Sequence, residues 1–204
     1  STVDEAGMIG FVCLFLGSRC ARIIGAHNAL GARLGERAGF DAVWASGLEI
    51  SASLGVPDAN IVSASEVCRI SAGLAAATKL PVMVDMDSGY GEPQQVYYAV
   101  KDFVRSGVKA VCIEDKPFPK SNSFSKREQT LQDTPDFVAK LQAAVMARGK
   151  RDFWIVARAE GFVVGASLSD VLARARAYAD AGADAIVIQS RQRTATEIKA
   201  FSDR

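Results

Sequence analysis

The sequence has few of the side chains that mark zinc-binding or disulfide-rich proteins. It contains 1 histidine and 4 cysteines in 204 residues. The cysteines, Cys13, Cys20, Cys68 and Cys112, show no close metal-type pairing. Cys68 and Cys112 lie in apolar surroundings typical of buried thiols. We therefore expect a reduced, cytoplasmic setting.

The sequence also lacks a charge excess and a long hydrophobic run. Its 24 lysines and arginines nearly balance 23 aspartates and glutamates, which argues against nucleic acid or an acidic membrane as partner. The apolar segment 6–17 (AGMIGFVCLFLG) is too short to cross a bilayer. Asp4 and Glu5 precede it where a signal peptide carries positive charge. We expect this segment to be a buried helix or strand, and the partner to be a small molecule.

A repeated unit organises the chain. The segments 36–47, 104–115 and 179–190 each read as a helix end, a glycine and a short apolar run. A glycine just past a helix lets the chain reverse, and a nearly continuous apolar run is typical of a buried parallel strand. With 49% hydrophobic residues, the chain can bury one sizeable core. The sequence predicts a single α/β domain over residues 1–204.

About six strands alternate with helices along the chain. Besides the runs in the repeats, we expect strands over 22–26, 82–85 and 153–157, and helices over 29–38, 94–106, 134–147 and 169–181. This alternation leaves a (β/α)8 TIM-type barrel or an open doubly wound sheet. Polar residues follow many different strands, which favours the barrel. Six strands cannot close it, so we expect it to lack its last strands, with a helix cut short near Lys199 to Arg204.

Carboxylates stand at the ends of two predicted strands. The segment Pro81 to Gly91 (PVMVDMDSGYG) carries Asp85 and Asp87, and the run beginning at Ala110 ends at Glu114. Clustered oxygen ligands suit Mg²⁺ or Mn²⁺. The alternative is that the two aspartates only form a turn, as aspartate often does. Two such strand ends in one chain favour a metal site.

Several segments together carry a family resemblance. They are GAHN (25–28), WASGL (44–48), Asp58, DMDSGYG (85–91), EDKPFPKSNS (114–123) and VARAE (156–160). In this order they resemble the phosphoenolpyruvate mutase and isocitrate lyase superfamily, over about Arg22 to Phe201. The sequence EDK at 114–116, followed by Asn122 and Ser123, resembles the signature of the mutase branch.

The resemblance implies a Mg²⁺-dependent enzyme acting on a keto or enol acid, with Mn²⁺ as a possible substitute. Asp85 would bind the metal directly, and Asp58, Asp87 and Glu114 would hold metal-bound waters. Trp44, Ser46, Gly47 and Leu48 would surround the substrate, and Arg158 would clamp an anionic oxygen. The family also implies a homodimer or homotetramer.

The loop 116–132 is rich in proline, serine and lysine. It carries Lys120 and Asn122, and we interpret it as a candidate gating loop. The alternative is an ordinary solvated connection. Moving a phosphoryl group between the oxygen and the carbon of an enolate needs a cation and positioned donors more than a strong acid or base. Lys120 and Asn122 suit that chemistry.

The sequence departs from the family at Gln189, where mutases usually carry a histidine. Glutamine still donates a hydrogen bond but cannot become cationic. Lyases of the superfamily place a cysteine in the loop after the fourth strand, and residues 116–132 contain none. The favoured activity is therefore interconversion of phosphoenolpyruvate and phosphonopyruvate, with Asp58, Lys120, Asn122, Arg158 and Gln189 as catalytic residues.

Rival interpretations remain. Phosphonopyruvate hydrolases typically have threonine in place of Asn122, and an oxaloacetate hydrolase or decarboxylase would use the same metal site. A third alternative is an inactive, truncated paralogue that serves as a subunit.

Some residues are expected to be structural only. We expect His27 to lie in a turn and Trp154 in the core. Nine basic residues are expected on solvated helix faces or at helix ends: Arg69, Lys79, Lys101, Lys109, Lys140, Arg148, Lys150, Arg174 and Arg176.

Overall fold

The computed structural model describes residues 21–123, 125 and 128–204. The apolar segment 6–17, Cys13 and Cys20 lie outside these residues. The strands are β1 (Ile23–Ala26), β2 (Ala42–Ala45), β3 (Val82–Asp85), β4 (Ala110–Glu114), β5 (Trp154–Ala159) and β6 (Ala185–Ile188). The helices are α2 (Ala29–Arg37), α3 (Gly47–Ser53), α4 (Ala64–Ala77), α5 (Pro93–Arg105), α6 (Thr134–Arg148), α7 (Leu168–Asp180) and α8 (Thr196–Ser202), with a short 3₁₀ helix at Gly161–Val164.

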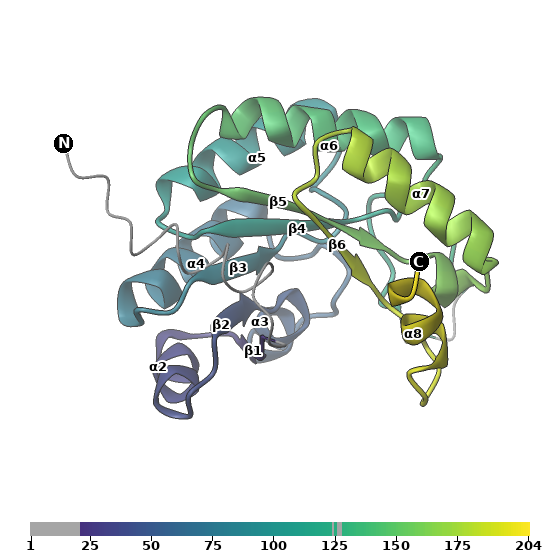
Figure 1. The fold of residues 1–204 in the computed structure, drawn as a ribbon. Helices are drawn as coiled ribbons and strands as arrows, with labels where there is room; N and C mark the ends of the chain where they lie inside the picture. Colours follow the sequence, from purple (N-terminus) through teal and green to yellow (C-terminus); the bar gives the residue numbers. More distant parts are fainter. Residues whose placement is uncertain (1–20, 124, 126–127) are drawn as a thin grey trace.

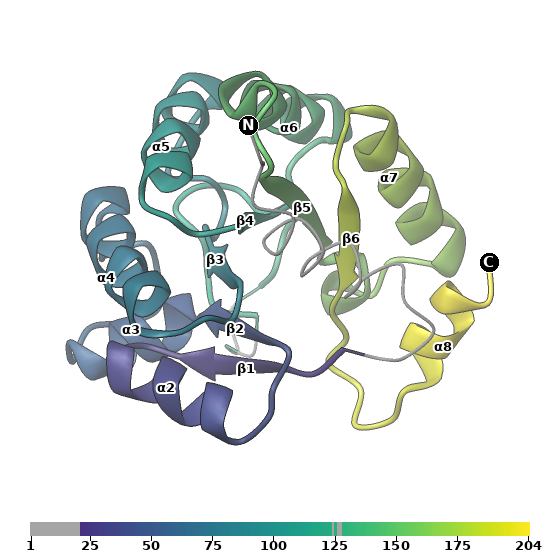
Figure 2. The ribbon, with the colours of Figure 1, turned by 60° about the vertical axis from the view of Figure 1, so that its left-hand side comes forward.

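The strands form one parallel sheet in the order β1-β2-β3-β4-β5-β6 (Figure 1). Each unit of strand and helix thus adds its strand beside the previous one. A doubly wound sheet would reverse its strand order instead. The sheet curls into an arc with helices on its outer side (Figure 2). The predicted TIM-type α/β architecture is confirmed, and within the described residues β1 and β6 each pair on one side only.

The sheet buries apolar side chains on both faces, as a barrel wall does. Its outer face packs against the helices, with Val84, Val111 and Ile155 fully buried. Its inner face carries a smaller cluster around Met83, Cys112 and other side chains, with Trp44 and Trp154 packed against it. Trp154 therefore contributes to packing, as the sequence indicated. Cys112 is buried, whereas Cys68 is only half-buried.

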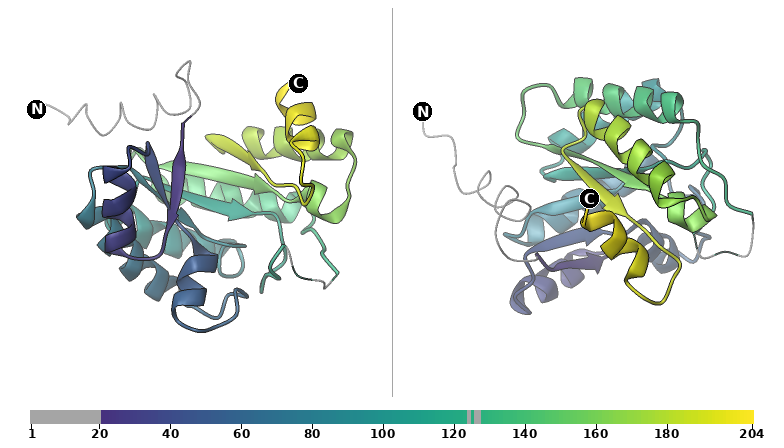
Figure 3. Two further views of the ribbon diagram at one scale, coloured as in Figure 1. Left: turned by 90° about the horizontal axis from the view of Figure 1, so that it is seen from below. Right: turned by 45° about the vertical axis from the view of Figure 1, so that its right-hand side comes forward.

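The glycine joints have the geometry that the repeats require. Gly39, Gly107 and Gly182 have φ angles of 76°, 89° and 99°, in the left-handed region that favours glycine. Each joint reverses the chain so that the next strand runs parallel to the last. The carboxyl ends of all six strands consequently lie at one side of the sheet (Figure 3).

Helices α3 and α4 were not predicted as such. Helix α3 begins at Gly47, inside the segment 44–48 that was expected to surround the substrate, and α4 has a capping box formed by Ser63 and Glu66. Helix α8 covers Thr196–Ser202, follows β6 and packs against α7 (Figure 3). Among the described residues, no helix has the length and hydropathy needed to cross a membrane.

Candidate active site

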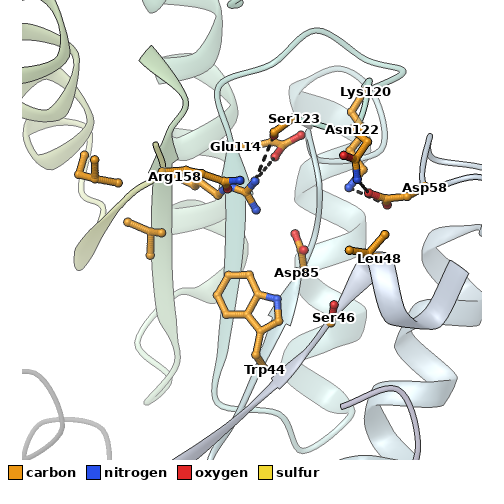
Figure 4. A pocket seen from close by; sticks show the side chains of 13 residues that line it. Trp44, Ser46, Leu48, Asp58, Asp85, Glu114, Lys120, Asn122, Ser123 and Arg158 are labelled. Atoms are coloured by element: carbon orange, nitrogen blue, oxygen red, sulfur yellow. Dashed lines mark hydrogen bonds and ion pairs between the residues drawn. The ribbon is translucent and has the colours of Figure 1, made fainter. Parts of the chain in front are cut away.

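A pocket of about 300 Å³ opens at the carboxyl ends of the strands (Figure 4). Most of the residues singled out from the sequence line it. The lining residues are Trp44, Ser46, Leu48, Asp58, Asp85, Glu114, Lys120, Asn122, Ser123, Arg158, Val187, Ile188 and Gln189. Gly47 and Asp87 are predicted site residues outside this lining. They lie next to it, because a Cβ on Gly47 would be 2.9 Å from Asp87 Oδ1 and 3.5 Å from Asp85 Oδ2.

The turn after β3 places two carboxylates at the base of the site. Asp85 ends the strand, and the Asp87 amide donates to Asp85 Oδ1 at 3.2 Å. Asp87 has a φ of 51°, a left-handed conformation that aspartate tolerates. The Glu114 amide at the end of β4 donates to the Asp87 carbonyl at 2.8 Å. These contacts fix three carboxylates relative to one another.

Lys120 introduces a cation among these acids. Its ammonium lies 2.8 Å from Asp58 Oδ1 and also contacts Asp87 Oδ1. Burial by itself would lower the pKa of Lys120, but the surrounding carboxylates, Asp87 first and then Asp85, outweigh burial and hold that pKa above its ordinary value. Lys120 therefore carries a positive charge in the pocket.

Two carboxyl groups of the site have raised pKa values. Burial, together with repulsion from Asp85, raises the pKa of Asp87 to about 8. Burial also raises the pKa of Glu114 to about 7, although the Arg158 guanidinium opposes this change. Both shifts mean that the anionic forms are under-stabilised by the protein alone. A further cation in the pocket would stabilise them.

The residues present suit a hard divalent cation. The donors are carboxylate oxygens, which Mg²⁺ and Mn²⁺ prefer. Glu114 Oε1 is buried and has no hydrogen-bond partner in the part of the chain that the structure describes. Within residues 21–123, 125 and 128–204, no three acidic, histidine or cysteine side chains form a complete cation site. Water and substrate oxygens would have to supply the remaining ligands, as is usual for Mg²⁺. The roles expected from the resemblance, with Asp85 as the direct ligand and Asp58, Asp87 and Glu114 holding waters, stay predictions.

Helix α3 forms another wall of the pocket. Ser46 caps it, with its hydroxyl oxygen accepting from the Glu49 amide at 3.2 Å. The hydroxyl hydrogen of Ser46 remains available as a donor, because accepting a hydrogen bond uses only a lone pair. The first amides of a helix have no intrahelical partner. The amides of Gly47 and Leu48 can thus donate to a ligand in the pocket.

The close approach of Gly47 to the carboxylates gives a test of this wall. In Gly47→Ala the new methyl would be 2.9 Å from Asp87 Oδ1, and Asp87 is held by Lys120 and by Asn60. We expect Mg²⁺ affinity to fall about tenfold, in the range for changes around a metal ligand. Titration calorimetry with Mg²⁺ would measure it.

The matched control is Gly73→Ala in α4, where nothing lies within 4 Å of the added methyl. That change should leave Mg²⁺ affinity unaltered and stabilise the helix by about 0.5–1 kcal/mol. Equal Mg²⁺ affinity in both variants would contradict the role given to Gly47.

Arg158 and Asn122 face the pocket from different elements. Arg158, on β5, has Nη2 at 3.4 Å from Glu114 Oε2, and its Nε donates to Glu160 Oε1. Asn122, on the loop 116–132, donates from Nδ2 to Asp58 Oδ2 at 2.8 Å. The loop thus reaches the carboxylate side of the pocket through Asn122 and Lys120. Its role as a gate stays a prediction.

Asn60 is a site residue that the sequence interpretation missed. It donates to Asp87 Oδ2 at 2.9 Å, and its Oδ1 accepts from the Lys120 amide at 2.6 Å. It therefore joins the turn after β3 to the loop 116–132. Its φ of 56° is tolerated by asparagine. The signal available was its position two residues after Asp58.

Lys140 corrects another expectation. It was placed on a solvated helix face, but it is 1% exposed and donates to the Ser88 carbonyl at 3.0 Å. Arg148 and Arg174 are also not simply solvated, because they pair with Asp184 and Asp115. His27 lies outside the pocket lining, with Nδ1 3.4 Å from Glu49 Oε2.

Comparison with known proteins places this site in a family. Residues 11–204 match the family model described as phosphoenolpyruvate phosphomutase. The chain is 43% identical over 177 residues to a phosphonopyruvate hydrolase of Variovorax sp. (strain Pal2), covering 86% of this chain and 61% of that protein. It is 41% identical over 180 residues to a phosphoenolpyruvate phosphomutase of Tetrahymena pyriformis, covering 88% of this chain and 60% of that protein.

Solved structures agree in fold. A phosphoenolpyruvate phosphomutase from Streptomyces platensis subsp. rosaceus superposes with a TM-score of 0.93 at 43% identity, covering 97% of this chain and 69% of that chain. A phosphonopyruvate hydrolase in complex with oxalate and Mg²⁺ gives a TM-score of 0.88 at 38% identity, covering 97% and 68%. The chain spans about three fifths of the length of the curated relatives it matches. It belongs to the phosphoenolpyruvate phosphomutase family, within the phosphoenolpyruvate mutase and isocitrate lyase superfamily.

Proposed function

We propose that this protein interconverts phosphoenolpyruvate and phosphonopyruvate with the help of Mg²⁺. The observation that carries the proposal is that one small pocket holds two kinds of polar group. Asp85 and Glu114 offer oxygen ligands for a cation, while Arg158, Lys120 and the Asn122 amide offer donors for an anion. A substrate with a keto acid at one end and a phosphoryl group at the other needs both.

The residues would divide this work by their chemistry. When bound, the cation would neutralise negative charge that develops on the keto oxygen. The C–P bond of phosphonopyruvate breaks and leaves its electron pair on the pyruvoyl enolate, whose oxygen then takes the phosphoryl group, so no atom is gained or lost. Arg158 would orient the anion with its guanidinium, and Asn122 would hold the migrating group. Gln189 would donate a further hydrogen bond from the end of β6.

The pocket disfavours lyase chemistry that uses a cysteine. The residues that line it include neither cysteine nor histidine among the part of the chain described, and the loop 116–132 has no cysteine in its sequence. Charge neutralisation and positioning are the means that this lining supplies. The proposal is consistent with that composition.

Incubation with phosphonopyruvate and Mg²⁺, followed by ³¹P NMR, tests the proposal directly. The phosphonate, the phosphate ester and free phosphate give separate signals. We expect phosphoenolpyruvate to appear, because Asn122 occupies the position at which the resemblance places asparagine in mutases. Free phosphate without the ester would overturn the mutase assignment.

Phosphonopyruvate hydrolysis is the second candidate. It is favoured by the 43% identity to the Variovorax hydrolase, against 41% to the Tetrahymena phosphomutase. The same spectrum separates the two, because hydrolysis releases phosphate in place of the ester. An Asn122→Thr variant tests whether the residue at position 122 decides between mutase and hydrolase activity. We infer that this variant would release more free phosphate and form less of the ester.

Self-association into a homodimer or homotetramer is part of the proposal on family grounds. Light scattering coupled to gel filtration measures the mass of the particle in solution. A mass of two or four chains supports it, and a mass of 21.7 kDa would contradict it.

A further inference from the structure

A buried acid next to the pocket connects two groups of the site that come from distant parts of the chain. Glu160 follows β5 directly and is 0% exposed. Residues alternate between the faces of a strand, so Glu160 continues the inward row that contains Arg158. Its amide donates to Asp115 Oδ1 at 2.8 Å, which fixes its backbone to the end of β4. Glu160 is not among the lining residues of the pocket, but each of its carboxylate oxygens bonds to a residue that is.

The two oxygens of Glu160 serve different elements. Oε1 accepts from Arg158 Nε on β5. Oε2 accepts from the Ser123 hydroxyl at 2.7 Å and lies 3.5 Å from Lys116 Nζ. Arg158 and Ser123 both line the pocket. We name these four residues, Lys116, Ser123, Arg158 and Glu160, the Glu160 network.

Lys116 extends the network into the loop. Its ammonium donates to Ser123 Oγ at 2.6 Å and to the Ser121 carbonyl at 2.9 Å. It therefore contacts the residues on both sides of Asn122, Ser121 through its backbone carbonyl and Ser123 through its side chain. Asn122 in turn donates to Asp58 Oδ2, another residue of the pocket lining. The position of the Asn122 amide thus depends on a lysine that lies outside the pocket lining.

The buried charges of the Glu160 network make its residues depend on one another. Lys116 is 2% exposed and Glu160 is 0% exposed, and a buried charge is stable only when it is paired and hydrogen-bonded. Glu160 is the acid that both Arg158 and Lys116 contact. Loss of the Glu160 charge would leave Lys116 without the anionic partner it has among the described residues, and would release Arg158 Nε at the same time. Each member therefore depends on the others.

We propose that Glu160 and Lys116 are positioning residues that set the Asn122 segment of the loop and the Arg158 guanidinium in register with each other. Neither would touch the substrate. Their effect on turnover would pass through Arg158 and Asn122, and that part of the inference rests on the proposed function. Their effect on the loop does not depend on any substrate.

Limited trypsin digestion of the protein tests the loop directly. The sequence has Lys126 and Arg127 as cleavage sites between Ser123 and Gln132, and mass spectrometry identifies the fragments. We expect Lys116→Met and Glu160→Gln each to raise the rate of cleavage there about tenfold, a coupling size usual for neighbours in one network. Because the two residues act as a unit, the double variant should show about the same tenfold increase.

The matched control is the same cycle on Arg148 and Asp184, a paired arginine and aspartate away from the pocket. Arg148→Met and Asp184→Asn should leave cleavage in the loop unchanged. An unchanged rate in the Lys116 and Glu160 variants, or effects that multiply to about a hundredfold in the double variant, would overturn the inference. If Glu160→Gln fails to fold, Ser123→Ala takes its place in the cycle, since it breaks the link without changing charge.

Kinetics then separates this inference from the proposed function. With phosphonopyruvate as substrate, kcat/KM should fall by a similar factor in each single variant and in the double variant. Multiplying effects on kcat/KM would overturn the positioning role. If the trypsin result holds but the unmodified protein does not act on phosphonopyruvate, the network stands and the proposed function fails.

Discussion

Replacing Asp85 with alanine should reduce turnover of phosphonopyruvate by more than about 1000-fold. Asp85 is the carboxylate proposed to bind Mg²⁺ directly, and a catalytic metal contributes several kcal/mol to transition-state stabilisation. Each 1.36 kcal/mol corresponds to a factor of ten in rate. The ³¹P NMR assay would measure the loss, and titration with Mg²⁺ would show whether binding of the cation disappears with it.

The variant should remain folded, which keeps this test interpretable. Asp85 repels Asp87, and together with burial it raises the pKa of Asp87 to about 8. Removing Asp85 therefore relieves repulsion, so we expect the midpoint of thermal unfolding without Mg²⁺ to stay the same or to rise. A general effect of losing a carboxylate is controlled by Asp184→Asn, which lies away from the pocket. Normal turnover or normal Mg²⁺ binding in Asp85→Ala would refute the metal assignment.

The strands of the parallel sheet could be predicted because several helix-to-strand joints carry a local signal. Gly39, Gly107 and Gly182 stand at the ends of helices and take the left-handed conformation there. An apolar run follows each one, largely buried in β2 and β4 and half-buried in β6. These are local properties that appear in the sequence at fixed spacing. The barrel-like curl of the sheet was predicted from the polar residues, which stand at the ends of many different strands.

Helices α3 and α4 were missed for different reasons. Helix α3 has 7 residues and begins at a glycine, which is a poor helix former. Its start depends on Ser46 as the cap and on its packing at the end of β2. Helix α4 was recognisable, because Ser63 followed by Glu66 is a capping-box pattern before an apolar segment.

The residues of the site were easier to predict than the contacts that join them. Asp58, Asp85, Asn122 and Arg158 were identified from residue type and resemblance, and the structure brings all four to one pocket. The connecting contacts escaped prediction because they join segments far apart in sequence, such as Asn60 with Lys120. Lys140 shows the same limit, since burial of a lysine depends on tertiary packing that a helix pattern does not encode.

Turnover of phosphonopyruvate should require the planar shape of the Arg158 guanidinium and not only its positive charge. In Arg158→Lys the positive charge beside Glu114 and Glu160 is kept, so the buried acids stay paired and the protein should fold. A lysine cannot reproduce the planar fork that donates to an anion and to Glu160 together. We expect kcat/KM for phosphonopyruvate to fall about 100- to 1000-fold, as when a preorganised donor to a transition state is lost. Steady-state kinetics with the NMR or a coupled assay would measure it.

Arg148→Lys provides the matched control for that substitution. The Arg148 side chain is 17% exposed and pairs with Asp184, and the Arg158 side chain is 13% exposed and pairs with Glu114. The two arginines are thus similarly enclosed and paired, but only Arg158 lines the pocket. If both substitutions lowered kcat/KM equally, the loss would come from general destabilisation. A loss confined to Arg158→Lys, with the charge retained, would show that the site needs a guanidinium held by Glu160 and not just a cation.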